Sequence, residues 1–327
     1  MKKIVLAAAL ASFANASYAY DIGPFDDLLV FGDSLSDPGN VVNEVFGGFP
    51  NIPGVSITNT DAYPNGQWTD GTTWAHKLGA TYESGKNFAY GGARAASQNP
   101  DSPLILDLFE QVDQYDTPSD LGSNPITAIF IGGNDFLGYF NPEDPTPKPP
   151  LNEFIGGVIA SIGQSVGALG AKGLTDFVVF GLPDLGKQPG LPAEQAAGLT
   201  ELAGQFNFFL NQMVQGLNTA PNGISASFFD VAYVLAPIFG DDSPFGVKDA
   251  PCVLKDENDN VTSICDDPEN YVFYDAVHPT DGVHSLIAEA FVDHVTPVPL
   301  PAGAPLLLVA LGALGVASRR RVAGRSD

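Results

Sequence analysis

Phe31-Gly32-Asp33-Ser34-Leu35-Ser36-Asp37-Pro38-Gly39-Asn40 is the stretch that decides the fold of this 327-residue chain. The apolar run before it, Leu28 to Val30, predicts a buried strand, and the Gly-Asp-Ser sequence predicts that this strand ends abruptly in a loop. A loop at that place displays the hydroxyl of Ser34, which makes Ser34 a candidate nucleophile. The alternative is that Asp33 and Ser34 only cap a following helix.

A serine nucleophile needs donors for the oxyanion that forms after attack. Asn87-Phe88-Ala89-Tyr90-Gly91-Gly92-Ala93 runs into two glycines, where the backbone can approach a ligand closely. The spacing from Asn87 favours the amide of Gly92 as a donor, with Gly91 as the second choice and a plain tight turn as the alternative. Gly132-Gly133-Asn134-Asp135 follows another apolar run and offers the side-chain amide of Asn134, unless Asn134 only closes a turn.

The nucleophile also needs a base and a group that orients the base. Asp275-Ala276-Val277-His278-Pro279-Thr280 places Asp275 and His278 three residues apart, so that one turn brings both side chains to the same face. We therefore expect Asp275 and His278 to point at Ser34 from a loop near the C-terminal end.

These four stretches, in this order, resemble the sequence blocks of the GDSL (SGNH) serine esterases and lipases over roughly residues 26 to 295. The resemblance implies catalysis by Ser34, His278 and Asp275. It also implies an oxyanion hole made by Ser34, Gly92 and Asn134, with no metal or organic cofactor. The implied substrate is a small-molecule or lipid ester. Two alternatives are a carbohydrate acetyl esterase that acts on extracellular polysaccharide, and a non-catalytic surface protein on the same scaffold.

The alternation of apolar strands with helical patterns predicts an α/β fold. Strands are expected at 28–30, 126–131, 176–180 and 224–231, and helices at 104–115, 151–169 and 199–217. With the resemblance, this order predicts an SGNH-hydrolase-like three-layer α/β/α sandwich on a five-stranded parallel sheet. The Gly- and Pro-rich segment 43–65 is expected to form a wall of the site, and the loop 181–186 part of its floor.

The two ends differ in composition from the body between them. Residues 1–19 combine Lys2-Lys3, an apolar run and small residues before Ala19, which is typical of a secretory signal. Residues 298–327 combine Val298-Pro299-Leu300-Pro301-Ala302, an apolar run and three arginines at 319–321, and they resemble the VPLPA-type C-terminal sorting signals of Gram-negative bacteria. We therefore expect a hydrolase domain at 20–297 that is exported to the periplasm, the outer surface or the medium. We expect its tail to lie transiently in the membrane, where a sorting protease cuts it, or else to stay as a permanent anchor.

The charge argues against nucleic acid as a partner. The formal net charge is −24. Six of the 14 basic residues but only one of the 38 acidic residues lie in the end segments, so the body carries −29.

Cys252 and Cys265 would form a disulfide in an exported protein, with two unpaired thiols as the alternative. The acidic run 256–260 lacks the glycine and the final glutamate of a calcium loop, which favours a solvated loop.

Overall fold

The computed structural model describes residues 21–96, 104–142 and 147–296 of the chain. Its centre is a parallel sheet of four strands in the order β1 (Asp27–Gly32), β2 (Pro125–Phe130), β3 (Asp176–Phe180) and β4 (Ser225–Phe229). Because all four strands run in the same direction, their carboxyl ends meet at one edge of the sheet. The predicted signal segment 1–19 and tail 298–327 lie outside the described residues.

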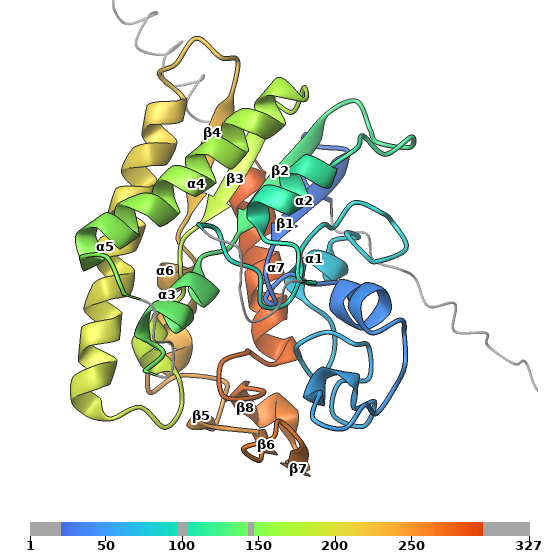
Figure 1. Cartoon of the computed structure of the whole chain (residues 1–327), viewed down its shortest axis with the longest axis vertical. Coiled ribbons are helices and arrows are strands. Elements are labelled where there is room, and N and C mark those ends of the chain that lie inside the picture. Colours follow the sequence, from blue (N-terminus) through green and yellow to red (C-terminus); the bar gives the residue numbers. More distant parts are fainter. Residues whose placement is uncertain (1–20, 97–103, 143–146, 297–327) are drawn as a thin grey trace, which may run out of the picture.

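Helices cover both faces of this sheet and complete three layers (Figure 1). One face carries α2 (Leu108–Gln114), α4 (Leu151–Ala171) and α5 (Ala193–Leu217). The other face carries α1 (Trp74–Lys77), α6 (Val231–Leu235) and α7 (Asp281–Val295). The strands follow one another in space as they do in sequence, so right-handed crossovers place the connecting helices on the same face. The predicted α/β/α sandwich is confirmed.

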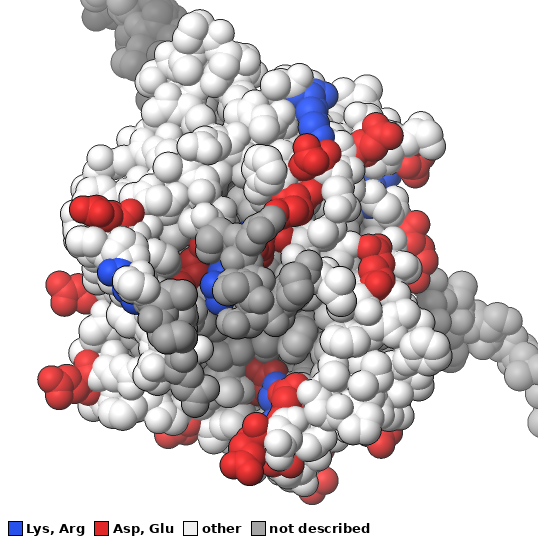
Figure 2. All heavy atoms as spheres, viewed as in Figure 1, with Lys and Arg blue, Asp and Glu red and all other residues white. Residues whose placement is uncertain are grey.

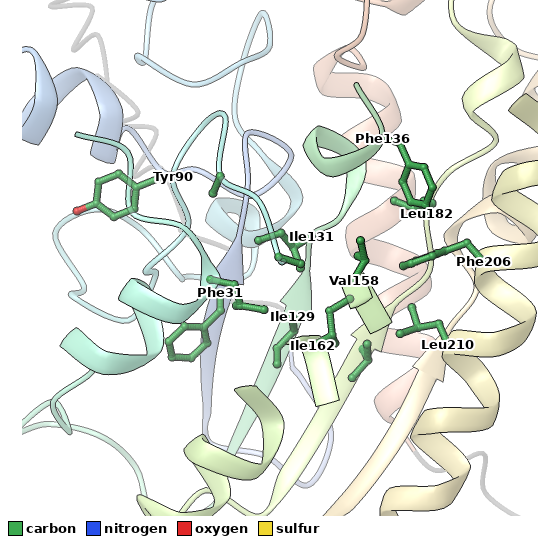
Figure 3. Close-up of a cluster of buried hydrophobic side chains, with 14 of the residues drawn as sticks. Phe31, Tyr90, Ile129, Ile131, Phe136, Val158, Ile162, Leu182, Phe206 and Leu210 are labelled. Carbon is green, nitrogen blue, oxygen red and sulfur yellow. The ribbon is translucent and has the colours of Figure 1, made fainter. Parts of the chain in front are cut away.

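Strand residues alternate between two hydrophobic clusters, one on each face of the sheet. In β1, Leu29 and Phe31 belong to the cluster under α4 and α5, whereas Leu28 and Val30 belong to the cluster under α7. Figure 3 shows the first cluster, in which side chains of the sheet meet those of the covering helices: Phe31, Ile129, Ile131, Val158, Ile162, Phe206 and Leu210. Burial on both faces explains why β1, β2 and β3 are largely apolar rather than alternating with polar residues, whereas the less buried edge strand β4 carries Ser225 and Ser227.

The predicted count of five strands is wrong for the described residues. The segment at Asn87 runs beside β1 but forms only one isolated bridge, between Asn87 and Val30. Two glycines follow after three intervening residues, and the second, Gly92, takes a positive φ of 86° that no regular strand allows. The segment therefore leaves the sheet before it can become a fifth strand.

Helix boundaries differ from the predictions at the N-terminal ends. The helix expected at 104–115 begins at Leu108, and the one expected at 199–217 begins at Ala193, directly after Pro192. All six residues of 193–198 are small or polar and show little apolar periodicity, which is why the pattern alone missed that first turn and a half. α4 at Leu151–Ala171 agrees closely with the prediction. It is also the one described helix that is long and apolar enough to cross a bilayer by length and composition.

Two small sheets lie beyond the strands' carboxyl edge. β5 (Val247–Pro251) pairs with β8 (Tyr271–Phe273), and β6 (Val253–Lys255) forms a hairpin with β7 (Val261–Ile264). A disulfide between Cys252 and Cys265 closes this hairpin. In its turn, the Asp256 carboxylate accepts hydrogen bonds from the N–H groups of Asn258 and Asn260. The helix α3 (Gly133–Phe140) follows β2 at the same edge of the main sheet.

The described surface is predominantly acidic. Figure 2 shows Asp and Glu side chains scattered over the visible face, with few Lys or Arg side chains among them. This distribution agrees with the net charge of the body and gives no cationic stripe on that face for a nucleic-acid backbone.

Candidate active site

Ser34 lies two residues after β1, where a close approach of two strands fixes the loop. A Cβ atom on Gly32 would lie 2.3 Å from the carbonyl oxygen of Phe130 on β2, so only glycine fits at this position. The side chain of Gln111 on α2 accepts the Gly32 N–H at 2.9 Å and donates to the Gly32 carbonyl at 2.8 Å. The Gly-Asp-Ser sequence is therefore held by backbone packing, and the alternative of a simple helix cap does not apply because no helix of the main layers begins here.

Three of the predicted residues form one hydrogen-bonded chain. The Oγ of Ser34 lies 2.8 Å from Nε2 of His278. The Nδ1 of His278 lies 2.8 Å from one carboxylate oxygen of Asp275 and 3.0 Å from the other. The backbone N–H groups of Val277 and His278 also donate to Asp275, which fixes the turn that carries both side chains. In this arrangement His278 can take the proton of Ser34 while Asp275 sets the imidazole tautomer.

Two side chains that the sequence did not indicate support Asp275 from behind. Tyr63 donates its hydroxyl to Asp275 at 2.8 Å, and the ammonium of Lys255 lies 3.6 Å from the same carboxylate oxygen. Burial alone would raise the pKa of Asp275, but the neighbouring imidazole of His278, the charge of Lys255 and the backbone N–H bonds outweigh it and hold the pKa well below its usual range. Asp275 is therefore ionised at neutral pH and can accept the hydrogen bond of a neighbouring imidazole.

Three donors with free hydrogen-bonding capacity converge beside Ser34. In the part of the chain that the structure describes, the backbone N–H groups of Ser34 and Gly92 have no acceptor. The side-chain amide of Asn134 uses one hydrogen on the carbonyl of Ala93 at 2.9 Å, which leaves the other available. By contrast, the Gly91 N–H donates to Asp37 at 2.8 Å. This difference favours Gly92 over Gly91 as the oxyanion donor, since the amide of Gly91 is already occupied.

Buried carboxylates hold the loops that carry these donors. Asp37 accepts the N–H groups of Gly39, Asn40 and Gly91, and Asp135 accepts those of Ala95 and Ala96. Burial raises the pKa of each of these two carboxyls to about 6, although the hydrogen bonds oppose the shift. Both side chains therefore position backbone and have no access to substrate.

Asp33, the neighbour of Ser34, has the largest shift of these buried acids. Burial raises the pKa of Asp33 to about 7, against the opposing effects of a hydrogen bond from the Leu35 N–H and of nearby His278. Its carboxyl faces the helix start at Gly133. With that pKa the carboxyl of Asp33 is partly protonated at neutral pH, which lessens the negative charge beside the nucleophile.

The three donors and the Ser-His pair open into a cavity of about 210 Å³. The ring of Trp68 lies 5.0 Å from that of His278 and forms one wall. Leu182, Pro183 and Leu185 form another, which confirms that the loop after β3 contributes to the site. Residues 43–65 were expected to line the site, but none of them is among the residues that line this cavity. They lie behind Asp275 instead, because Tyr63 points its hydroxyl at that carboxylate.

No group of three or more His, Cys, Asp or Glu side chains in the described ranges has the arrangement of a metal site.

Comparison with known proteins places this arrangement in a family. The family model for GDSL-like lipases and acylhydrolases matches residues 28–291. A phosphatidylcholine-sterol acyltransferase of Aeromonas hydrophila is 26% identical over 235 residues, which cover 69% of this chain and 64% of that protein, less than two thirds of its length. A GDSL esterase/lipase of Arabidopsis thaliana is 26% identical over 81% of this chain and 88% of its own. An Arabidopsis protein described as an inactive GDSL esterase/lipase-like protein is also 26% identical, over 77% of this chain and 67% of its own.

Proposed function

Because the chain belongs to the family of GDSL-like lipases and acylhydrolases, which makes it a carboxylic ester hydrolase, we propose that it works through Ser34, His278 and Asp275. The observation that carries the proposal is the unbroken chain of hydrogen bonds from the hydroxyl of Ser34 through His278 to Asp275. Unoccupied oxyanion donors beside the same hydroxyl support it.

The first half of the reaction forms an acyl-enzyme. Ser34 Oγ attacks the ester carbonyl carbon while His278 Nε2 takes the hydroxyl proton, and Asp275 stabilises the imidazolium that results. The negative charge that develops on the carbonyl oxygen is stabilised by the N–H groups of Ser34 and Gly92 and the free amide hydrogen of Asn134. His278 then gives its proton to the leaving alcohol oxygen as the carbon–oxygen bond breaks.

The second half repeats these steps with water. His278 takes a proton from a water molecule, the resulting hydroxide attacks the acyl carbon, and the proton returns to Ser34 as the carboxylic acid leaves. Atoms and charges balance without a metal or an organic cofactor.

The test of this proposal is hydrolysis of 4-nitrophenyl esters by Ser34→Ala and His278→Ala. Each substitution should lower kcat by about a thousandfold or more, because members of such a triad act as a unit. Both proteins should keep the circular dichroism spectrum of the wild type. A folded Ser34→Ala protein that hydrolyses esters at nearly the wild-type rate would show that Ser34 is not the nucleophile.

We also propose that the enzyme is exported and that its tail directs sorting. The support is the composition of residues 1–19 and 298–327, together with the Cys252–Cys265 disulfide, which suits an oxidising compartment. Cleavage is expected between Val298 and Ala302 after transient insertion of the apolar tail into the membrane. Mass spectrometry of protein from its native host should give a C-terminus upstream of Leu306. A C-terminus that still contains the arginines 319–321 would mean a permanent anchor.

Of the alternatives, a carbohydrate acetyl esterase would use the same catalytic residues and differ in the acyl group and the alcohol of the ester. A non-catalytic protein would have no need for an intact triad with its supporting groups Tyr63 and Lys255. The geometry therefore favours catalysis, and the acyl group is the open question.

A further inference from the structure

A second and larger cavity lies next to the one that contains Ser34. Its volume is about 300 Å³. The two cavities share six lining residues, which come from the end of β2 and from the segments that follow β1, β3 and β8: Leu35, Phe130, Pro183, Leu185, Gln188 and Val277. Leu35 directly follows the nucleophile and Val277 directly precedes the base, so the second cavity begins where an ester bound to Ser34 would begin.

The walls of the second cavity are almost entirely apolar. α6 contributes Leu235, the short helix after it Phe239, β8 Phe273, and α7 Ile287. The polar side chains that line it, Asp184, Lys187 and Gln188, belong to one loop at one side. A cavity with this lining offers few partners to water and suits an apolar group.

The size of this cavity sets it apart from a packing defect. Protein interiors contain few voids larger than one water molecule. An apolar cavity of about 150 Å³ already stays dry and binds small apolar molecules, and this one is about twice as large. A mostly apolar pocket of that size beside a nucleophile suits an apolar part of the substrate.

We propose that this cavity holds the acyl chain of the substrate, so that the enzyme prefers esters of medium-chain fatty acids over acetyl esters. The inference rests on the proposed function, because the ester must be attacked by Ser34. After the first step the acyl group stays bonded to Ser34 while the alcohol leaves and water takes its place. The more enclosed cavity suits the group that stays, and the open one suits the group that must exchange with water.

The volume gives an expected chain length. A water molecule has a share of about 30 Å³ in the liquid, and a methylene group is of similar size, so the cavity has room for roughly ten such groups. We therefore expect the preferred acyl chain to have about eight to ten carbons. Each buried methylene should raise kcat/KM by up to about fourfold until the cavity is full.

The test compares two series of esters on the wild-type protein. In the first series the alcohol is fixed as 4-nitrophenol and the acyl group grows from acetyl to palmitoyl. In the second the acyl group is fixed as acetyl and the alkyl alcohol grows from methyl to decyl. We expect kcat/KM to rise to a maximum near eight to ten acyl carbons in the first series, and to change less than about threefold in the second.

Two substitutions at one position should move the maximum in opposite directions. Leu235→Trp fills part of the cavity and should shift the maximum to chains shorter by about three to four carbons. Leu235→Ala enlarges the cavity and should shift the maximum to longer chains. Ala232→Phe, on the same helix and also in the lining, repeats the first change if Leu235→Trp does not fold. Leu202→Ala, which removes a buried leucine on the opposite face of the sheet, is the matched control and should leave the maximum unchanged.

Several results would overturn the assignment. Rates that fall with each added acyl carbon but rise with the length of the alcohol would place the alcohol in the cavity. Rates that depend on neither length, or a maximum that Leu235→Trp and Leu235→Ala leave in place, would mean that the cavity is not used.

If the folded protein hydrolysed no ester at all, the proposed function would fail separately. Binding of methyl octanoate to Ser34→Ala, measured by saturation-transfer NMR, would then decide the inference. Binding that Leu235→Trp abolishes would support it, and the absence of binding would overturn it.

Discussion

At the scale of single residues, the candidate site is defined by which hydrogen bonds are already made and which are left open. Asp37 accepts the N–H of Gly91, whereas the N–H of Gly92, which lines the cavity, has no acceptor among the described residues. Asn134 uses only one of its two amide hydrogens, on the carbonyl of Ala93. An anion that appears during the reaction would find donors that are already oriented, and preorganised donors of this kind lower the barrier most.

Substitution of Asn134 by Ala should lower kcat by about two orders of magnitude with little change in KM, the usual cost of one oxyanion donor. Steady-state kinetics on 4-nitrophenyl butyrate measure both constants. Asn134→Asp keeps the size of the side chain but removes the donor. The kcat of this variant should fall at least as far as that of Asn134→Ala. If instead KM rises while kcat stays near the wild-type value, Asn134 serves only to hold the carbonyl of Ala93.

At the scale of elements, the disulfide-closed hairpin β6–β7 connects an exposed loop to the centre of the site. The hairpin carries Lys255, whose ammonium lies 3.1 Å from Asp259 in the hairpin turn and 3.6 Å from Asp275. Ser56 and Asp259 tie the same hairpin to the segment 43–65. The two segments together enclose the side of Asp275 that faces away from the histidine.

Replacing Cys252 and Cys265 together by Ser should lower the free energy of unfolding by about 3 kcal/mol, the chain-entropy value for a loop of this length. Urea denaturation of the oxidised wild type and of the double variant measures this difference. Dithiothreitol should lower the midpoint of the wild type and leave that of the variant unchanged. Equal midpoints for the oxidised wild type and the variant would mean that the hairpin is held by its other contacts alone.

The elements themselves were largely predictable from the sequence. Apolar runs on 28–30, 126–131 and 176–180 gave three of the strands, because strands buried on both faces are apolar throughout. The predicted count of five strands was wrong: the apolar runs located four, and the segment at Asn87 forms only an isolated bridge to β1 before the two glycines. The small sheets formed by β5 to β8 have three to five residues per strand, too short for any periodicity to indicate.

Some residues of the candidate site could be predicted from the sequence and others could not. Ser34, Gly92, Asn134, Asp275 and His278 stand in recognisable motifs, and the structure brings all five together around one cavity or behind it. Tyr63 and Lys255 carry no motif, and they meet Asp275 only because two loops about 190 residues apart fold against each other. The apolar cavity beside Ser34 could not be predicted either, since its lining comes from several elements that are distant in sequence.

At the scale of the whole molecule, the protein has many carboxylates on its surface and three buried aspartic acids with raised pKa values. The chain has a net charge of −24, and burial raises the pKa of Asp33 to about 7 and those of Asp37 and Asp135 to about 6. Through these three groups the folded protein holds more protons than the unfolded chain between about pH 4 and 7, while the buried His284, whose pKa burial lowers to about 3, opposes them in part. These three groups make stability fall as pH rises through that window, and the mutual repulsion of surface carboxylates acts in the same direction.

We expect the Tm to be roughly 3–10 °C higher at pH 5 than at pH 8. The pKa shifts of the buried acids set the change in the free energy of unfolding between these pH values, and that change sets the shift in Tm for a domain of this size. Below about pH 4 the trend should reverse, because the lowered pKa of Asp275 stabilises the fold only while that carboxyl is ionised. Scanning calorimetry across pH 3.5–8 measures the profile. Repeating it in 0.5 M NaCl screens the surface charges but not the buried ones, so most of the difference should persist. A Tm that is constant or rises from pH 5 to 8 in high salt would contradict the protonation of the buried acids.

We propose that the Oγ atom of Ser34, activated by His278, is the atom to which the acyl group is transferred. The most direct measurement is mass spectrometry of the protein after reaction with a fluorophosphonate, a reagent that bonds covalently to activated serines. We expect one added phosphonyl group on the peptide that contains Ser34, none on Ser34→Ala, and labelling of His278→Ala that is slower by about a thousandfold. Labelling of a different residue, or labelling of Ser34 at the same rate with and without His278, would contradict it.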